Sequence, residues 1–102
     1  MTALLQAKRS EIAALCRRRR VSRLDVFGSA ARGTFEAESS DLDLLVEFQP
    51  LGPGERAEAY FGLLEDLGDL FQRPVDLVMA RAISNPYFRR AVEQTREMRY
   101  AA

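Results

Sequence analysis

Three aspartates stand inside segments that otherwise resemble apolar strands, and they are the residues best suited to chemistry. Asp41 and Asp43 lie two positions apart in the run SDLDLLVEF, and Asp76 lies in PVDLVM. Side chains at i and i+2 of a strand leave the same face, roughly 6.6 to 6.8 Å apart along the backbone. Strands disfavour Asp, and carboxylates this close are costly unless a cation lies between them. If the two strands are neighbours, all three carboxylates meet and we predict a metal site. For the pair alone, a water-facing sheet surface is the alternative.

A Gly-Ser turn upstream is suited to binding a phosphate. Gly28 ends an apolar segment, and Ser29 to Arg32 is expected to form one or two helical turns. The free N–H groups and the dipole at a helix start favour an anion, and glycine lets the backbone approach it. Alone, this pattern is equally typical of a turn with a helix cap. Together with the three acids, it predicts metal-dependent chemistry on a nucleoside triphosphate.

Composition narrows the chemistry further. The 102 residues include no histidine and one cysteine, Cys16, which excludes imidazole-based triads and zinc sites. Metal ligands must then be carboxylates, which suit a hard ion such as Mg²⁺ or Mn²⁺. Fifteen basic and fifteen acidic residues give zero net charge, so direct nucleic-acid binding is not expected. Without a long apolar run or a leader-like start, we expect a cytoplasmic protein that contacts no membrane.

The order of elements predicts an α/β fold. We expect helices over residues 3–19, 29–32 and 55–71 and one beginning near Pro86, with strands over residues 23–27, 41–48 and 75–79. The three strands would form a small mixed sheet with helices packed against it, and residues 1–102 would form a single domain. Leu42, Leu44 and Val46 would point to one face of the sheet, and Asp43 and Leu45 to the other.

The helices carry recognisable core faces and basic patches. In the long helix, the expected core positions recur at three- and four-residue steps: Ala57, Tyr60, Phe61, Leu64, Leu67, Gly68 and Phe71. In the last helix we expect an inner face made of Phe88, Ala91, Val92 and Thr95. We expect the outward face to carry the arginines Arg89, Arg90, Arg96 and Arg99. The run Arg17–Arg20 is expected to be a solvated helix end; the alternative is a surface that contacts an anion or a partner.

The motifs resemble a known superfamily. The segment GSAARG at 28–33, SDLDL at 40–44 and VDL at 75–77 resemble the nucleotidyltransferase fold of the DNA polymerase β superfamily. The chain length and the order of elements resemble its minimal nucleotidyltransferase (MNT) branch, whose members are antitoxins paired with HEPN-domain toxins. The spacer between Ser29 and Asp41 is one residue longer than the family pattern, and we expect the loop at 34–39 to absorb it.

The resemblance implies roles for the candidate residues. Gly28, Ser29 and Arg32 would hold the triphosphate of ATP, and the three aspartates would bind two Mg²⁺ ions. Asp76 would also help deprotonate the acceptor hydroxyl. The hydroxyl would attack the α-phosphate in line and release pyrophosphate.

The acceptor is expected to be a macromolecule, because a chain of this size leaves little room for a second substrate domain. The resemblance implies that the acceptor is a tyrosine hydroxyl of a cognate HEPN toxin, and that attachment of AMP there would neutralise the toxin. The arginines of the last helix and of residues 17–20 are candidate contacts for it. Two alternatives stay open: an antitoxin that neutralises by binding alone, and a nucleotidyltransferase for a small acceptor such as an aminoglycoside.

Overall fold

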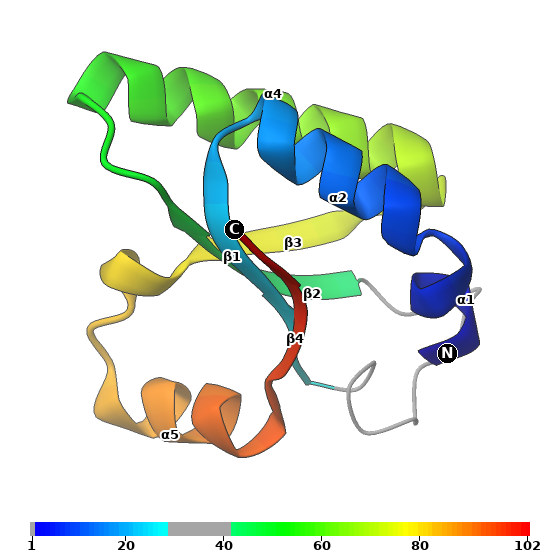
Figure 1. The fold of residues 1–102 in the computed structure, drawn as a ribbon. Helices are drawn as coiled ribbons and strands as arrows, with labels where there is room; N and C mark the ends of the chain where they lie inside the picture. Colours follow the sequence, from blue (N-terminus) through cyan, green and yellow to red (C-terminus); the bar gives the residue numbers. More distant parts are fainter. Residues whose placement is uncertain (1, 29–41) are drawn as a thin grey trace.

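The computed structural model describes residues 2–28 and 42–102 (Figure 1). Two helices, α1 (Thr2–Ala7) and α2 (Arg9–Arg18), precede β1 (Val21–Val26). After residues 29–41 come β2 (Leu42–Phe48), α4 (Pro53–Phe71) and β3 (Val75–Met79). A short 3₁₀ helix η1 (Ala80–Ala82), α5 (Pro86–Thr95) and β4 (Glu97–Ala101) complete the fold. The helix expected over residues 29–32 falls outside the described part, and the single helix expected over 3–19 is divided by a turn at Lys8.

The sheet has four strands in the order β3-β2-β1-β4, so the expected three-stranded sheet is wrong. β2 and β3 run parallel, whereas β1 is antiparallel to both β2 and β4. The missed strand follows α5 directly, because Arg96 has extended dihedral angles (φ −65°, ψ 137°) that end the helix. Arg96 and Arg99 therefore do not extend an outward helical face as expected; their side chains are only 16% and 13% exposed.

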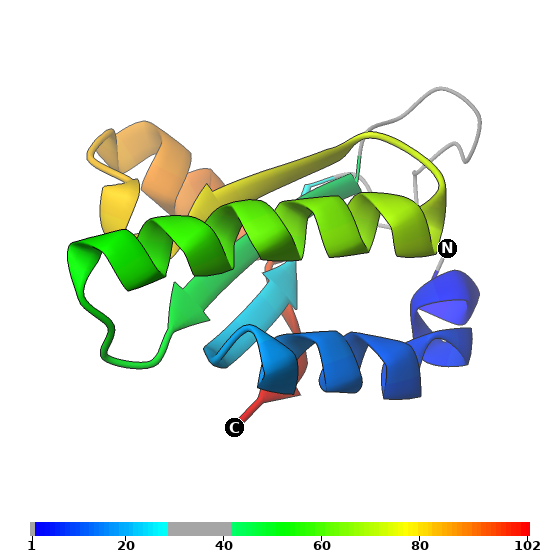
Figure 2. The same cartoon turned by 90° about the horizontal axis from the view of Figure 1, so that it is seen from above.

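The sheet lies between two unequal helical layers (Figures 1 and 2). α2 and α4 cover one face, where Leu42, Leu44 and Val46 belong to the larger core cluster. α5 covers the other face, where Leu45 packs with Phe27, Ile83 and Val92 in a smaller cluster. This division confirms the alternation predicted for the second strand, and it places Asp43 on the α5 side.

The long helix α4 has well-defined ends and a core face that differs from the prediction. It begins at Pro53, whose fixed φ and missing N–H suit a first helical position. It ends where Gln72 takes left-handed angles (φ 53°). Leu67 and Phe71 are buried as expected. Phe61 was expected in the core, but it is 65% exposed because Ala59 and Leu63 face the sheet instead.

None of the helices within residues 2–28 and 42–102 combines the length and the apolar character needed to cross a membrane.

Candidate nucleotide and metal site

Asp43 and Asp76 are brought together by the parallel pairing of β2 and β3. They are register partners in that ladder, so their backbones are about 4.8 Å apart across the strands. Their neighbours Leu42, Leu44 and Leu77 belong to the core beneath α2 and α4. The side chains of both aspartates consequently project from the α5 side of the sheet. Asp43 is half-buried there, and Asp76 is exposed. The condition on which the predicted site depends, that these two strands are neighbours, is met. Asp41 lies outside the described residues.

Gly28 lies against the carboxylate of Asp43. A Cβ at this position would be 2.9 Å from Asp43 Oδ2, and the backbone has φ +71°. Both features require glycine, since a side chain would be strained and would collide with Asp43. The Phe27 N–H donates to the carbonyl oxygen of Asp43 at 3.1 Å, which ties the start of this turn to β2. The other two predicted phosphate ligands, Ser29 and Arg32, lie outside the described residues.

The carboxylates fit a divalent cation, as judged by the donors themselves. Two carboxylates emerge side by side from adjacent strands, and the missing Cβ of Gly28 leaves space beside one of them. Oxygen donors of this kind suit Mg²⁺ or Mn²⁺. Residues 2–28 and 42–102 alone do not supply a cluster of three metal-ligating side chains, and the predicted third ligand is Asp41.

Thr95, at the end of α5, contacts the site although the sequence suggested only a core position for it. The Gly28 N–H donates to Thr95 Oγ1 at 3.1 Å. In turn, the Thr95 hydroxyl is 3.1 Å from the carbonyl oxygen of Ala91, to which it donates. A threonine in a last helical turn gives no local signal for such a contact, because its partner is far away in the sequence.

A buried ion pair fixes the end of α5 to the sheet. Asp25 is 0% exposed, and its carboxylate accepts hydrogen bonds from Arg23 Nε at 2.9 Å and from Arg96 Nε. Burial opposes the charged form of Arg96, but the hydrogen bonds to Asp25 and Glu93 outweigh it and raise the pKa of Arg96. The sequence did not single out Asp25, since its role depends on β4.

The arginine run Arg17–Arg20 at the end of α2 mostly pairs with α4. Arg19 Nε is 2.9 Å from Asp66 Oδ2, and Arg18 approaches the same carboxylate at 3.6 Å. Arg20 pairs with Glu55 at 3.1 Å. The hydrogen bond with Asp66 is the main cause that raises the pKa of Arg19. These contacts favour a structural role for Arg18, Arg19 and Arg20 over a free anion-binding surface.

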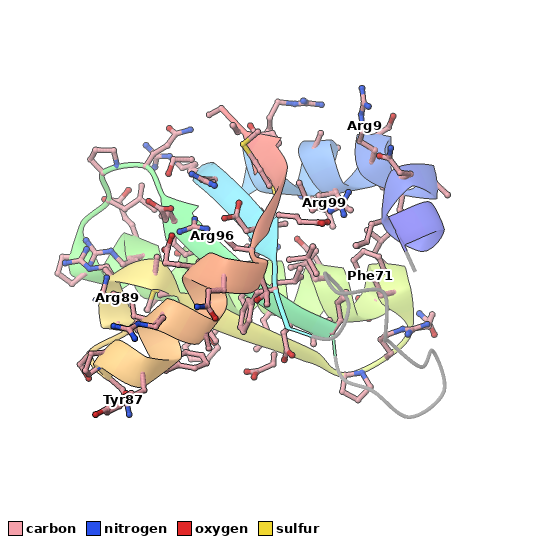
Figure 3. The ribbon with its side chains drawn as sticks, turned by 90° about the horizontal axis from the view of Figure 1, so that it is seen from below. Arg9, Phe71, Tyr87, Arg89, Arg96 and Arg99 are labelled. Carbon is pink, nitrogen blue, oxygen red and sulfur yellow. The ribbon has the colours of Figure 1, made fainter. Side chains whose placement is uncertain are left out.

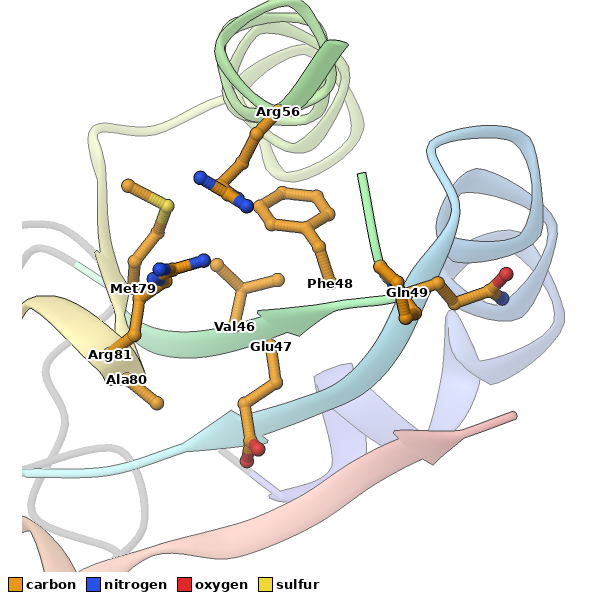
Figure 4. A pocket seen from close by; sticks show the side chains of 9 residues that line it. Val46, Glu47, Phe48, Gln49, Arg56, Met79, Ala80 and Arg81 are labelled. Atoms are coloured by element: carbon orange, nitrogen blue, oxygen red, sulfur yellow. The ribbon is translucent and has the colours of Figure 1, made fainter. Parts of the chain in front are cut away.

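A hollow of about 490 Å³ lies away from the aspartates. Val46, Phe48 and Met79 line it on the α4 side of the sheet, at the carboxyl ends of β2 and β3. Figure 4 shows the Arg56 and Arg81 side chains reaching toward this space. Since Asp43 and Asp76 lie near the opposite ends of their strands and on the other face, the hollow is not part of the candidate site.

Comparison with known proteins identifies the class. The family model described as "Nucleotidyltransferase domain" matches residues 9–98. The chain therefore belongs to the nucleotidyltransferase domain family and is an enzyme of that class, whose members use a nucleotide substrate and divalent metal ions.

Two relatives from Methanocaldococcus jannaschii make the resemblance more specific. A protein with the provisional name protein adenylyltransferase MJ0128 is 39% identical over 75 residues, which are 74% of this chain and 72% of that protein. A second, provisionally named protein adenylyltransferase MJ1379, is 36% identical over 75 residues, 74% of this chain and 73% of its own length.

Solved structures show the same fold. One provisionally described as a minimal nucleotidyltransferase superposes with a TM-score of 0.75 at 36% identity, covering 91% of this chain and 90% of that one. A toxin–antitoxin structure with AMP-PNP gives a TM-score of 0.69 at 25% identity, covering 92% and 73%. A Shewanella oneidensis complex of a tri-AMPylated HEPN toxin with an MNT antitoxin is alike in fold, with a TM-score of 0.64 at 22% identity, covering 96% and 73%.

Proposed function

We propose that this protein is a cytoplasmic, Mg²⁺-dependent protein adenylyltransferase that moves AMP from ATP to a tyrosine hydroxyl of a HEPN-domain toxin and so acts as its antitoxin. The observation that carries this proposal is the apposition of Asp43 and Asp76 beside Gly28. Family membership supports nucleotidyl transfer. The names of the relatives support a protein acceptor, and the toxin–antitoxin structure with AMP-PNP supports the partner and the nucleotide.

The chemistry follows from what each side chain can do. The acceptor oxygen attacks the α-phosphorus, the bond from that phosphorus to the bridging oxygen breaks, and pyrophosphate leaves. Asp76 is exposed, so an incoming hydroxyl can reach its carboxylate and transfer its proton. Asp43 is half-buried and lies next to the Gly28 backbone. Gly28, with Ser29 and Arg32, would hold the triphosphate.

Divalent ions would complete the site. When bound, they neutralise phosphate charge and orient the reacting groups. Asp43 and Asp76, with Asp41, would hold them, and we propose two ions, as the resemblance implies. The contribution of the chain is positional: two adjacent strands fix the carboxylates before substrate arrives.

The outer side of α5 is the part of the basic surface best suited to the partner. Arg18, Arg19, Arg20 and Arg96 are already engaged in ion pairs. On α5, by contrast, Tyr87 is 83% exposed and points away from the body of the protein (Figure 3). Exposed aromatic and arginine side chains dominate binding energy at many interfaces. We therefore propose that an acidic surface of the toxin docks on α5 around Tyr87 and the exposed Arg90.

The test is transfer of labelled AMP to the product of the neighbouring gene. The wild type with Mg²⁺ and labelled ATP should modify a tyrosine of that protein and end its toxicity, with the modified site located by mass spectrometry. Asp76→Asn should abolish labelling. Asp69→Asn is the matched control, since it removes an exposed aspartate on α4 that is outside the site. No label from the wild type on a toxic neighbour would refute the proposal.

The same assay separates the alternatives. If Asp76→Asn loses labelling yet still neutralises fully, binding alone is the mechanism of the antitoxin. If the wild type leaves the neighbour unlabelled but confers resistance by modifying an aminoglycoside, the acceptor is a small molecule.

A further inference from the structure

We propose that Thr95 is a positioning residue for the nucleotide site: its hydroxyl holds the backbone of Gly28 in place beside the Asp43 carboxylate. The inference rests on the proposed function, which gives Gly28 and Asp43 their parts in binding ATP and in transfer. It assigns to the last turn of α5 a role that is distinct from packing.

The hydrogen bonds around the Thr95 hydroxyl show to which groups it donates and from which group it accepts. Oγ1 is 3.1 Å from the Ala91 carbonyl oxygen and 3.4 Å from that of Val92. A hydroxyl has one hydrogen and two acceptor lone pairs. Donation to the helix carbonyls therefore leaves a lone pair for the Gly28 N–H, which lies 3.1 Å away and 67 positions earlier in the sequence.

Gly28 is where such a constraint matters. Its φ is +71°, and glycine adopts positive and negative φ about equally readily. The residue type alone therefore does not fix the conformation of this turn. Yet its Cα faces the Asp43 carboxylate so closely that a Cβ would be 2.9 Å from Oδ2. Rotation of this peptide would change the space beside Asp43, and a misplacement of about 1 Å at a reacting centre can cost roughly a hundredfold in rate.

Thr95 is itself held firmly by its neighbours. The next residue, Arg96, binds the buried carboxylate of Asp25, and Figure 3 shows Arg96 at the end of α5 beneath the sheet. Earlier in the helix, Val92 is buried in the smaller core cluster, and the ring of Phe88 packs edge-on against Phe27 at 6.0 Å. The hydroxyl thus acts from a fixed helix end on a glycine whose own conformational preference does not fix its φ.

The test compares three variants of the full chain. Thr95→Val replaces the hydroxyl by a methyl group of similar size, Thr95→Ser keeps the hydroxyl, and Gln94→Ala changes the exposed neighbour as a control. Hydrogen exchange of the Gly28 amide, followed by NMR without ligands, should be about fivefold faster in Thr95→Val, as for loss of one hydrogen bond. AMP transfer should fall about tenfold or more in kcat/KM. Thr95→Ser should restore both quantities, and Gln94→Ala should change neither.

The exchange measurement separates positioning from general destabilisation and from failure of the proposed function. The amide of Leu63, in the core-facing part of α4, is measured in the same spectra. Equal acceleration at Gly28 and Leu63, an unchanged Gly28 amide in Thr95→Val, or no rescue by Thr95→Ser would overturn the inference. If the wild type transfers no AMP, the proposed function fails, and affinity for Mg²⁺ and a non-hydrolysable ATP analogue replaces kcat/KM as the second readout. Equal affinity in wild type and Thr95→Val would then also overturn the inference.

Discussion

Replacement of Arg96 by methionine should destabilise the protein by about 3 kcal/mol, because the buried carboxylate of Asp25 then loses one of its two arginine partners. Asp25 is 0% exposed, and Arg96 and Arg23 each serve one of its two oxygens. Removing one partner of a buried ion pair costs about 3–5 kcal/mol. We expect the lower end, because Arg23 remains at 2.9 Å and its side chain is 43% exposed, which lets water approach.

Urea unfolding followed by circular dichroism measures this change as a shift in midpoint at constant slope. The control is Arg20→Met, which breaks a pair whose side chains are 57% and 61% exposed; it should cost less than about 1 kcal/mol. The double variant Asp25→Leu, Arg96→Met should be more stable than Arg96→Met alone, since the buried charge is then removed and Arg23, whose side chain is 43% exposed, can be solvated. An Arg96→Met protein as stable as Arg20→Met, or a double variant less stable than the single one, would refute the reasoning.

Three further predictions concern other parts of the molecule. Gly68→Ala, with open space where the new methyl group would lie, should stabilise α4 by about 0.5–1 kcal/mol in urea unfolding. Gly62→Ala should gain less, because its Cβ would lie 2.5 Å from the Arg19 guanidinium; equal gains would contradict this. Burial raises the pKa of the Cys16 thiol from 9.0 to about 12, so its proton stabilises the fold below pH 9. Above pH 9 stability should fall by up to about 1.4 kcal/mol per pH unit relative to Cys16→Ala, and parallel pH curves would exclude this. Mg²⁺ should raise the thermal midpoint of the wild type but not of Asp76→Asn, and equal shifts would argue against a metal at this pair.

The strands that carry the site could be predicted from local sequence. Asp43 and Asp76 each interrupt an apolar run. The alternation of side chains along β2 was enough to place Asp43 on the face of the sheet opposite to that of Leu42 and Leu44. The structure then adds the register between the two strands, which depends on how α4 returns the chain alongside β2. Roles for these residues as metal ligands stay predictions.

What local sequence could not supply are contacts between distant segments. β4 is a short run of mixed polarity, and it becomes a strand by pairing with β1. Asp25 gains its buried partner only because Arg96 leaves the helix at that point. On α4, two overlapping apolar faces satisfy the helical period, and only packing against the sheet selects Leu63 over Phe61. In each case tertiary contacts decide between options that local propensity leaves equal.

The parallel pairing of β2 and β3 has a consequence for how the protein acquires its site during synthesis. Asp43 and Asp76 are separated in sequence by the whole of α4, so closing this crossover carries an entropic cost that local elements do not. A growing chain cannot hold Asp43 beside Asp76 until β3 has emerged and docked. Ligands that need both acids therefore bind the folded state alone, and nucleotide and metal together would draw newly made chains toward it.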